Sequence, residues 1–317
     1  MNRRITAAIA AALALTACQA TLPASVDSPP EARLEQLIGA DAMLARIGHR
    51  LSVANVDLCP RTAMLAGWSL HAANLYTDDM RAEAVARLGL QGDLPGLAYV
   101  VPDGPADRAG LRAGDLIVAI EGRALEPGRD DGSPSETGFL AHRSALDAAL
   151  ARGAAAVRVR RGGDILDLTV TPVRGCGYAF VAVPSPELAA GAYEDEIQVT
   201  AAMAAYAGSD DDLAVVAGHE FAHAVLGHPL QRRGLGRLPW RTEAREREAD
   251  RASLYLLARA GYDPARAPAL WRRMSADFWQ VRQPQIDHPS GESRARALEP
   301  VVAEIARLRA AGLPITP

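Results

Sequence analysis

The chain has 317 residues, of which 49% are hydrophobic and 23% are charged, and its formal net charge is −4. This is the composition of an ordinary globular protein, with enough residues for two domains that each bury a core. The acidic balance, with arginine supplying all the basic residues, gives no sign of a phosphate-binding surface, so we expect no nucleic-acid partner.

The N-terminus has the pattern of an export signal. Two arginines precede an apolar run over residues 5–15, and the sequence LTAC ends in Cys18. The run is too short to span a bilayer as a mature helix, which leaves a cleaved ordinary signal peptide or lipid attachment at Cys18 after cleavage. The LTAC pattern favours lipidation. We therefore expect a signal peptide over 1–17 and a tether over 18–30. By resemblance to other lipoproteins, Gln19 favours a lipid-anchored protein on the periplasmic face of a Gram-negative outer membrane.

Residues 31–95 follow the tether and begin with an amphipathic helix over 31–47, which we expect to pack on the C-terminal domain rather than on lipid. With Cys18 set aside, Cys59 and Cys176 remain as an even pair in an exported chain, where disulfides persist. We expect them to bond to each other; the alternative is two buried free thiols. No segment after the signal is apolar enough for a transmembrane helix.

The intervening insert, residues 96–175, contains a second module. At 100–122 the sequence VVPDGPADRAGLRAGDLIVAIEG combines tight turns with an alternating apolar strand. It resembles the PDZ domains of bacterial proteases, and a helix over 139–152 and a hairpin turning at Gly162 would complete the domain. The resemblance implies a small β-barrel or sandwich with helices that binds a peptide as an added strand, although no glycine-led carboxylate loop is evident at 96–99. The alternative is a purely structural or autoinhibitory module.

Residues 219–223 read HEFAH. Positions i and i+4 of a helix share a face, so His219 and His223 can both direct a ring nitrogen at one metal ion. Glu220, about 100° further round, reaches a water beside that ion. Ser209 as an N-cap and the three aspartates after it predict where this helix begins. Taken alone, the motif could also be two histidines on a polar helix face.

A catalytic zinc site needs a third protein ligand. The three-histidine class is excluded because Gly227 and His228 are out of step with its HExxHxxGxxH pattern, and we place His228 on the opposite side of the helix as a supporting or structural residue. The other class takes a glutamate from a second helix, which we expect over 242–261. Glu246 would be the ligand, and Asp250, one turn later, would accept the other N–H of a ligating histidine. The alternative is a solvated, charged helix surface.

Four pieces of the chain resemble, in order, the gluzincin metallopeptidase family that includes the CAAX prenyl proteases, HtpX and BepA. They are AYEDEIQVTAAM, DDLAVVAGHEFAHAVLGH, EREADRASLYLLARAGYDP and DHPSGESRARAL, within about residues 176–300. The resemblance implies one zinc ion per chain, held by His219, His223 and Glu246, with Glu220 as the general base.

Two residues of the last piece gain a meaning only from this resemblance. His288 matches a histidine that faces the metal in relatives, where it can assist the oxyanion or cap the zinc. Arg294 matches a recurrent arginine near the metal whose role the sequence does not define.

These patterns predict an α+β fold: a mainly helical zincin domain with a small edge-strand sheet over 176–317, completed by 31–95, with the PDZ domain inserted at 96–175. The expected activity is zinc-dependent endopeptidase of the cell envelope, with polypeptide substrates extended along an edge strand at 192–200. By resemblance, misfolded or stalled envelope proteins are the expected substrates. Two other functions remain open: an outer-membrane assembly factor or chaperone with a largely shut site, and a PDZ adaptor with vestigial proteolysis.

Overall fold

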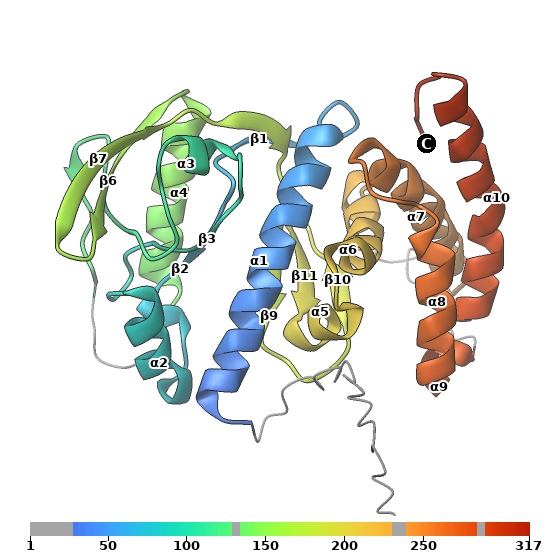
Figure 1. Cartoon of the computed structure of the whole chain (residues 1–317), viewed down its shortest axis with the longest axis horizontal. Coiled ribbons are helices and arrows are strands. Elements are labelled where there is room, and N and C mark those ends of the chain that lie inside the picture. The colour runs from blue at the N-terminus through green and yellow to red at the C-terminus, as the bar shows by residue number, and fades with distance from the viewer. Residues whose placement is uncertain (1–27, 129–133, 230–238, 284–288) are drawn as a thin grey trace, which may run out of the picture.

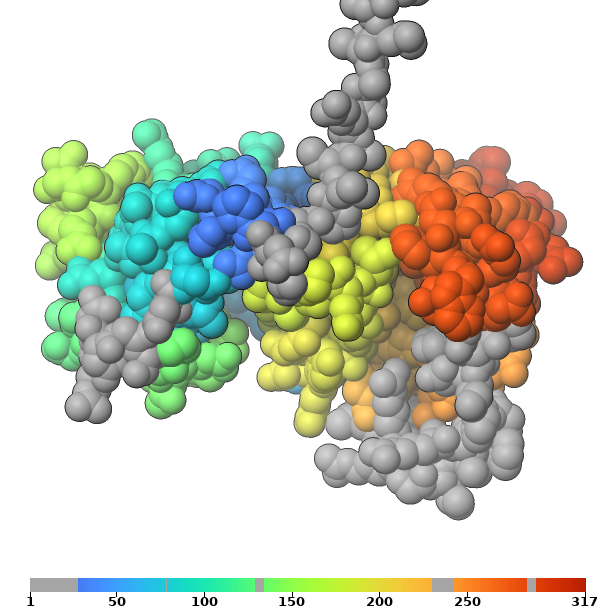
Figure 2. Space-filling model, turned by 90° about the horizontal axis from the view of Figure 1, so that it is seen from below, coloured from blue at the N-terminus to red at the C-terminus, as the bar shows by residue number. Residues whose placement is uncertain are grey.

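A computed structural model describes residues 28–128, 134–229, 239–283 and 289–317. The fold mixes helices and sheets in two parts, with the long helix α1 (Pro30–Ala54) between them (Figure 1). In space-filling view the strands and helices of residues 60–175 lie on one side and the helices of residues 239–317 on the other (Figure 2). Among the described residues, no helix combines the length and apolarity needed to cross a membrane.

An antiparallel sheet with strand order β2-β3-β4-β6-β7 forms the first part. Its strands are β2 (Trp68–His71), β3 (Gly96–Val100), β4 (Leu116–Ile120), β6 (Ala155–Arg161) and β7 (Asp164–Val170), and β5 (Arg123–Ala124) pairs with β4. The helices α3 (Pro105–Arg108) and α4 (Thr137–Ala151) accompany it. Alternate residues of β6 point inward, so Val157 and Val159 join Ile117, Leu146 and Leu150 in a separate core, as the period of a half-buried strand requires.

The sheet begins earlier in the chain than position 96, where the sequence placed the domain boundary. Its edge strand is β2, and a two-stranded ladder of β1 (Thr62–Leu65) with β8 (Val173–Cys176) closes the insert. Residues 31–95 are therefore not only helical: β2 belongs to the sheet of the insert, and β1 pairs with β8 in a separate two-stranded sheet. Between β2 and β3 lie η1 (Ala73–Leu75) and α2 (Asp78–Leu88).

The second part contains a three-stranded sheet with the order β10-β11-β9. The strands are β9 (Ala179–Val183), β10 (Ala190–Ala192) and β11 (Glu196–Thr200), and β11 is parallel to β9 and antiparallel to β10. The sequence had placed an edge strand at 192–200. In the structure β11 is the central strand, because both of its edges are paired, and the edge strand beside the helices is β10.

Among the described residues, six helices complete this part, and a large hydrophobic core lies among them and α1. They are α5 (Ala201–Ala207), α6 (Asp210–Val225), α7 (Pro239–Arg259), α8 (Arg266–Asp277), α9 (Trp279–Arg282) and α10 (Gly291–Ala310). The expected amphipathic helix is α1, whose buried side chains Leu44, Ile47 and Leu51 share one core with Phe221 of α6 and Tyr255 of α7. This packing fixes α6 against α7, and these two helices carry the candidate site.

Candidate metal centre

Helix α6 presents the HEFAH residues, and its own sequence explains where it starts. Ser209 is the N-cap, and its side chain accepts a hydrogen bond from the backbone N–H of Asp212 at 3.2 Å. Aspartates in the first turn favour the positive end of the helix dipole. One turn apart near the other end, His219 and His223 are 5% and 2% exposed, so neither is the solvent-facing histidine of the alternative interpretation.

Glu246 of α7 joins these two histidines. Nε2 of His219 lies 3.1 Å from Nε2 of His223 and 3.2 Å from Oε2 of Glu246, and Nε2 of His223 lies 3.4 Å from Oε1 of Glu246. In a tetrahedral zinc site with bonds of about 2.0–2.2 Å, neighbouring ligand atoms lie roughly 3.3–3.6 Å apart. Glu246 is only 1% exposed. The three buried groups therefore have the spacing and the donor types that suit one zinc ion.

The carboxylate of Glu220 is more accessible than the three candidate ligands. Glu220 follows His219 on α6 and is half-buried, and among the described residues no hydrogen bond or ion pair engages its side chain. Burial lowers the pKa of His223, while the nearby charges of Glu246 and Glu220 oppose that shift. Glu220 is thus close enough to act electrostatically on the candidate ligands and is available for proton transfer.

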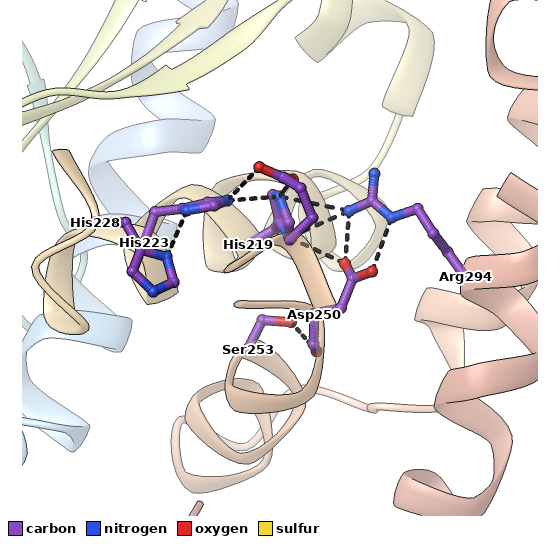
Figure 3. Close-up of polar contacts among 7 residues, drawn as sticks. His219, His223, His228, Asp250, Ser253 and Arg294 are labelled. Carbon is purple, nitrogen blue, oxygen red and sulfur yellow. Dashed lines mark hydrogen bonds and ion pairs between the residues drawn. The ribbon is translucent and has the colours of Figure 1, made fainter. Parts of the chain in front are cut away.

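Behind His219, Asp250 and Arg294 form a buried pair (Figure 3). Oδ1 of Asp250 lies 3.0 Å from Nδ1 of His219, and Arg294 donates to both Asp250 oxygens, at 2.9 Å from Nε and 2.5 Å from Nη2. Burial raises the pKa of Asp250, but the charge of Arg294 and the hydrogen bond from His219 outweigh it, and the pKa falls to about 2. An ionised Asp250 accepts the Nδ1 proton of His219, so Nε2 is the nitrogen that is directed at a metal.

The groups around His219 also shift its own pKa. Burial and the charge of Arg294 lower it, but Asp250 and Glu246 more than offset them and raise it to about 9. The two carboxylates that raise this pKa would also favour a metal cation, and binding of zinc would release a proton from His219.

Trp271 of α8 is a site residue that the sequence interpretation missed. Its ring lies under the guanidinium of Arg294, 3.4 Å from ring centroid to Cζ, and edge-on to His219 at 6.3 Å. Such stacking holds a guanidinium in one orientation. The only sequence signal was a large aromatic side chain on the apolar face of an amphipathic helix, which usually marks core packing.

His228 does not lie across the helix as the sequence predicted. Helix α6 ends at Val225, and Gly227 takes a left-handed conformation (φ 71°) that turns the chain back. The ring of His228 therefore packs against His223, with their Nδ1 atoms 2.9 Å apart, and is 2% exposed.

Of the remaining predicted residues, Cys18 and His288 lie outside the described residues. Cys59 and Cys176 form a disulfide, with their Cα atoms 5.6 Å apart, that joins the segment after α1 to the end of β8.

Among the described residues, the outer edge of β2 pairs with no other strand, and a glycine-containing loop precedes β2. Gly67 is left-handed (φ 75°), and the carbonyl groups of Ala66 and Gly67 accept hydrogen bonds from Ala106 and Val101. Within the described part of the chain, the N–H groups of Ala66 and Gly67 have no acceptor. The sequence interpretation sought such a loop at 96–99, which lies in the neighbouring strand β3.

Comparison with known proteins bears on this insert. The family model described as PDZ domain matches residues 96–138. The chain therefore contains a PDZ domain. A crystal structure of the HtrA3 PDZ domain bound to a phage-derived ligand (FGRWV) is similar at 22% identity, covering 36% of this chain and 89% of that chain, with a TM-score of 0.25. No curated protein matches the chain.

Proposed function

We propose that the chain is a zinc-dependent endopeptidase. The observation that carries this proposal is the convergence of His219, His223 and Glu246, all buried and at zinc-ligand spacing, beside the unengaged carboxylate of Glu220. A buried structural zinc site would have four protein ligands, whereas three ligands leave a position open for chemistry. Among the described residues, this trio is the only cluster of potential ligands of this kind.

The residues of the site suit peptide hydrolysis. Zinc, when bound, would act as a Lewis acid on the scissile carbonyl and make an adjacent water easier to deprotonate. Glu220 would take the proton from the attacking water and pass it to the leaving amine. Asp250 would hold the ring of His219 in one tautomer and orientation, and Arg294 would keep Asp250 ionised.

An extended polypeptide fits the surroundings of this site. The edge strand β10 lies against α6, and its outer edge pairs with no other strand among the described residues. A substrate that adds to β10 as a strand would form backbone hydrogen bonds with it. Such binding would not depend on the side chains of the substrate. This suits unfolded segments of many proteins, and we propose misfolded or stalled envelope proteins as the substrate class.

The test is a comparison of zinc content and cleavage of an unfolded polypeptide. Glu220→Gln should keep zinc and lose cleavage by at least about 10²–10⁴-fold, the usual contribution of acid–base catalysis. His219→Ala, His223→Ala and Glu246→Ala should lose the metal. Glu243→Gln, on the exposed face of α7, is the matched control and should change neither property. Full cleavage by Glu220→Gln would refute the proposal.

A second function, peptide capture, has its own support in the PDZ domain. Within the described residues, the N–H groups of Ala66 and Gly67 have no acceptor and precede a strand, β2, whose outer edge is unpaired; this arrangement would hold a C-terminal carboxylate at the end of an added strand. The PDZ domain would then select substrates for the protease. If proteolysis is vestigial, the chain would instead act as a PDZ adaptor. Short peptides with an apolar last residue should bind with a free carboxylate and bind weakly when amidated; equal binding of both forms would exclude this mode.

The cellular setting is a further part of the proposal. We propose that the protein is exported and anchored through a lipid on Cys18 at the outer membrane. Its support is the N-terminal sequence, together with a disulfide of the kind that persists outside the cytoplasm. An assembly factor or chaperone with a shut site would share this location and would differ by the absence of Glu220-dependent turnover.

A further inference from the structure

His228 lies beside the candidate metal centre and is not one of its ligands. The three ligand atoms are Nε2 of His219, Nε2 of His223 and a carboxylate oxygen of Glu246. His228 instead contacts the opposite nitrogen of His223, with Nδ1 to Nδ1 at 2.9 Å, and it is 2% exposed (Figure 3). Its own Nε2 lies 3.4 Å from Oε2 of Glu248 on α7.

These contacts define one consistent set of protons. If Nε2 of His223 is to bind a metal, the proton of the neutral ring must be on Nδ1. That proton points at Nδ1 of His228, so Nδ1 of His228 must be unprotonated. The proton of the neutral His228 ring is then on Nε2. Nε2 of His228 in turn faces the carboxylate of Glu248. Every donor in the series His223, His228, Glu248 thus meets an acceptor.

We propose that His228 is a positioning residue that holds His223 in the Nδ1–H tautomer, with Nε2 free for zinc. This inference rests on the proposed zinc site and adds a residue to it. Ligating histidines almost always donate their other N–H to a carboxylate, a backbone carbonyl or a water. His219 follows this rule through Asp250, whereas His223 donates to a second imidazole.

The two histidines are thus supported differently. The carboxylate of Asp250 contacts His219, and the guanidinium of Arg294 supplies its counter-charge. This side of the site therefore holds a buried ion pair. A neutral His228 supplies an acceptor to His223 without adding a second buried carboxylate, which would need its own counter-charge. Among the described residues, the carboxylate that faces His228 is that of Glu248, and its side chain is 60% exposed.

The chain path that places His228 also depends on local sequence. The backbone N–H of His228 donates to the carbonyl of His223 at 3.0 Å, and the left-handed Gly227 makes this turn possible. The spacing of five residues between the two rings is therefore a consequence of the end of helix α6.

The test reads the tautomer and the metal separately from cleavage. In the metal-free full chain at near-neutral pH, long-range ¹H–¹⁵N spectra should show His223 protonated at Nδ1 and His228 at Nε2. His228→Phe removes the acceptor and should weaken zinc binding by about 10–100-fold. His228→Gln offers an oxygen to accept and an amide to donate, so it should bind zinc more tightly than His228→Phe. His142→Phe in the PDZ domain is the control and should leave zinc affinity unchanged.

Several outcomes would overturn the proposal. These are protonation of His223 at Nε2 in the metal-free wild type, zinc affinity of His228→Phe equal to that of the wild type, or His228→Gln no better than His228→Phe. If His228→Phe does not fold, the tautomers in the wild-type spectra still decide. Loss of proteolysis without any change in these readouts would concern the proposed function and not His228.

Discussion

Replacement of Arg294 by methionine tests the buried support of His219. Arg294 and Asp250 have side chains that are each 7% exposed, so Arg294→Met leaves a carboxylate buried without its counter-charge. Removing one partner of a buried ion pair costs about 3–5 kcal/mol. Methionine replaces the apolar stem of arginine but has no guanidinium to stack on Trp271, so the loss includes that contact together with the charge and the hydrogen bonds.

The pKa of Asp250 gives a second measure of the same interaction. A pKa of about 2 in the folded protein, against about 3.9 in the unfolded chain, corresponds to roughly 2–3 kcal/mol of stabilisation near neutral pH. Because the folded pKa is the lower one, this stabilisation is complete above about pH 5 and is lost as the pH falls toward 2. The difference in stability between wild type and Arg294→Met should therefore shrink over that range.

Urea unfolding of the chelator-treated protein measures both effects. Arg294→Met should lower the free energy of unfolding by about 3 kcal/mol near neutral pH. The double variant with Asp250→Asn should be less destabilised than the sum of the single variants, since no buried charge then remains unpaired. Arg272→Met, on the exposed face of α8 with surface partners, is the control and should change stability little. A wild-type stability of Arg294→Met at neutral pH would refute this reasoning.

Three further predictions concern the export signal, the disulfide and the last motif. Cys18→Ala should leave the mature protein soluble in the periplasm, and its retention in membranes after a carbonate wash would contradict lipidation. Loss of the Cys59–Cys176 bond, which spans a sequence separation of 117, should cost about 2–5 kcal/mol in urea unfolding, provided that peptide mapping of the oxidised protein finds no free thiols. His288→Ala should keep zinc but change the rate of cleavage, upward if His288 caps the metal and downward if it supports the oxyanion; an unchanged rate would make it structural.

The sequence was most informative where geometry is local. Two histidines four residues apart on a helix must share a face, and Ser209 with its following aspartates marks the start of α6 as found. The pairing of Glu246 with these histidines depends on the packing of α6 against α7, which spacing alone does not determine. It was predicted from the expected second helix over 242–261 and from the resemblance of several motifs in order, and the structure brings the three side chains together.

Long-range strand pairing was predicted less well. Strand β2 has four residues, WSLH, and a segment that includes α2 separates it from its partner β3. Such a short strand has too little alternation to be detected, and its place is decided by pairing across the sheet. The predicted position of His228 was wrong for a different reason. The prediction continued an ideal helix beyond Val225, whereas α6 ends there and the left-handed Gly227 turns the chain back.

The PDZ domain is held against the C-terminal part by a polar contact that passes through α1. Arg46 donates to both carboxylate oxygens of Asp210, at 2.7 and 2.6 Å, and to the hydroxyl of Tyr99 at 3.1 Å. Tyr99 lies in β3 of the PDZ sheet, and Asp210 is the first residue of α6. One side chain of α1 therefore connects the PDZ sheet with the N-terminus of the helix that carries His219 and His223.

A second contact through α1 has the same effect at β2. Nε2 of His71, at the end of this edge strand, lies 2.8 Å from Oδ2 of Asp41, whose other oxygen accepts from the backbone N–H of Ala182 in β9 at 3.3 Å. Residues on both sides of α1 also share one continuous apolar core. Domains joined only by linkers move freely, whereas this interface fixes their relation. If a peptide binds at β2 as proposed, these contacts oppose a swing of the PDZ domain toward the candidate metal centre. We therefore expect such a peptide to reach the centre through its own length, or to act on it through α1.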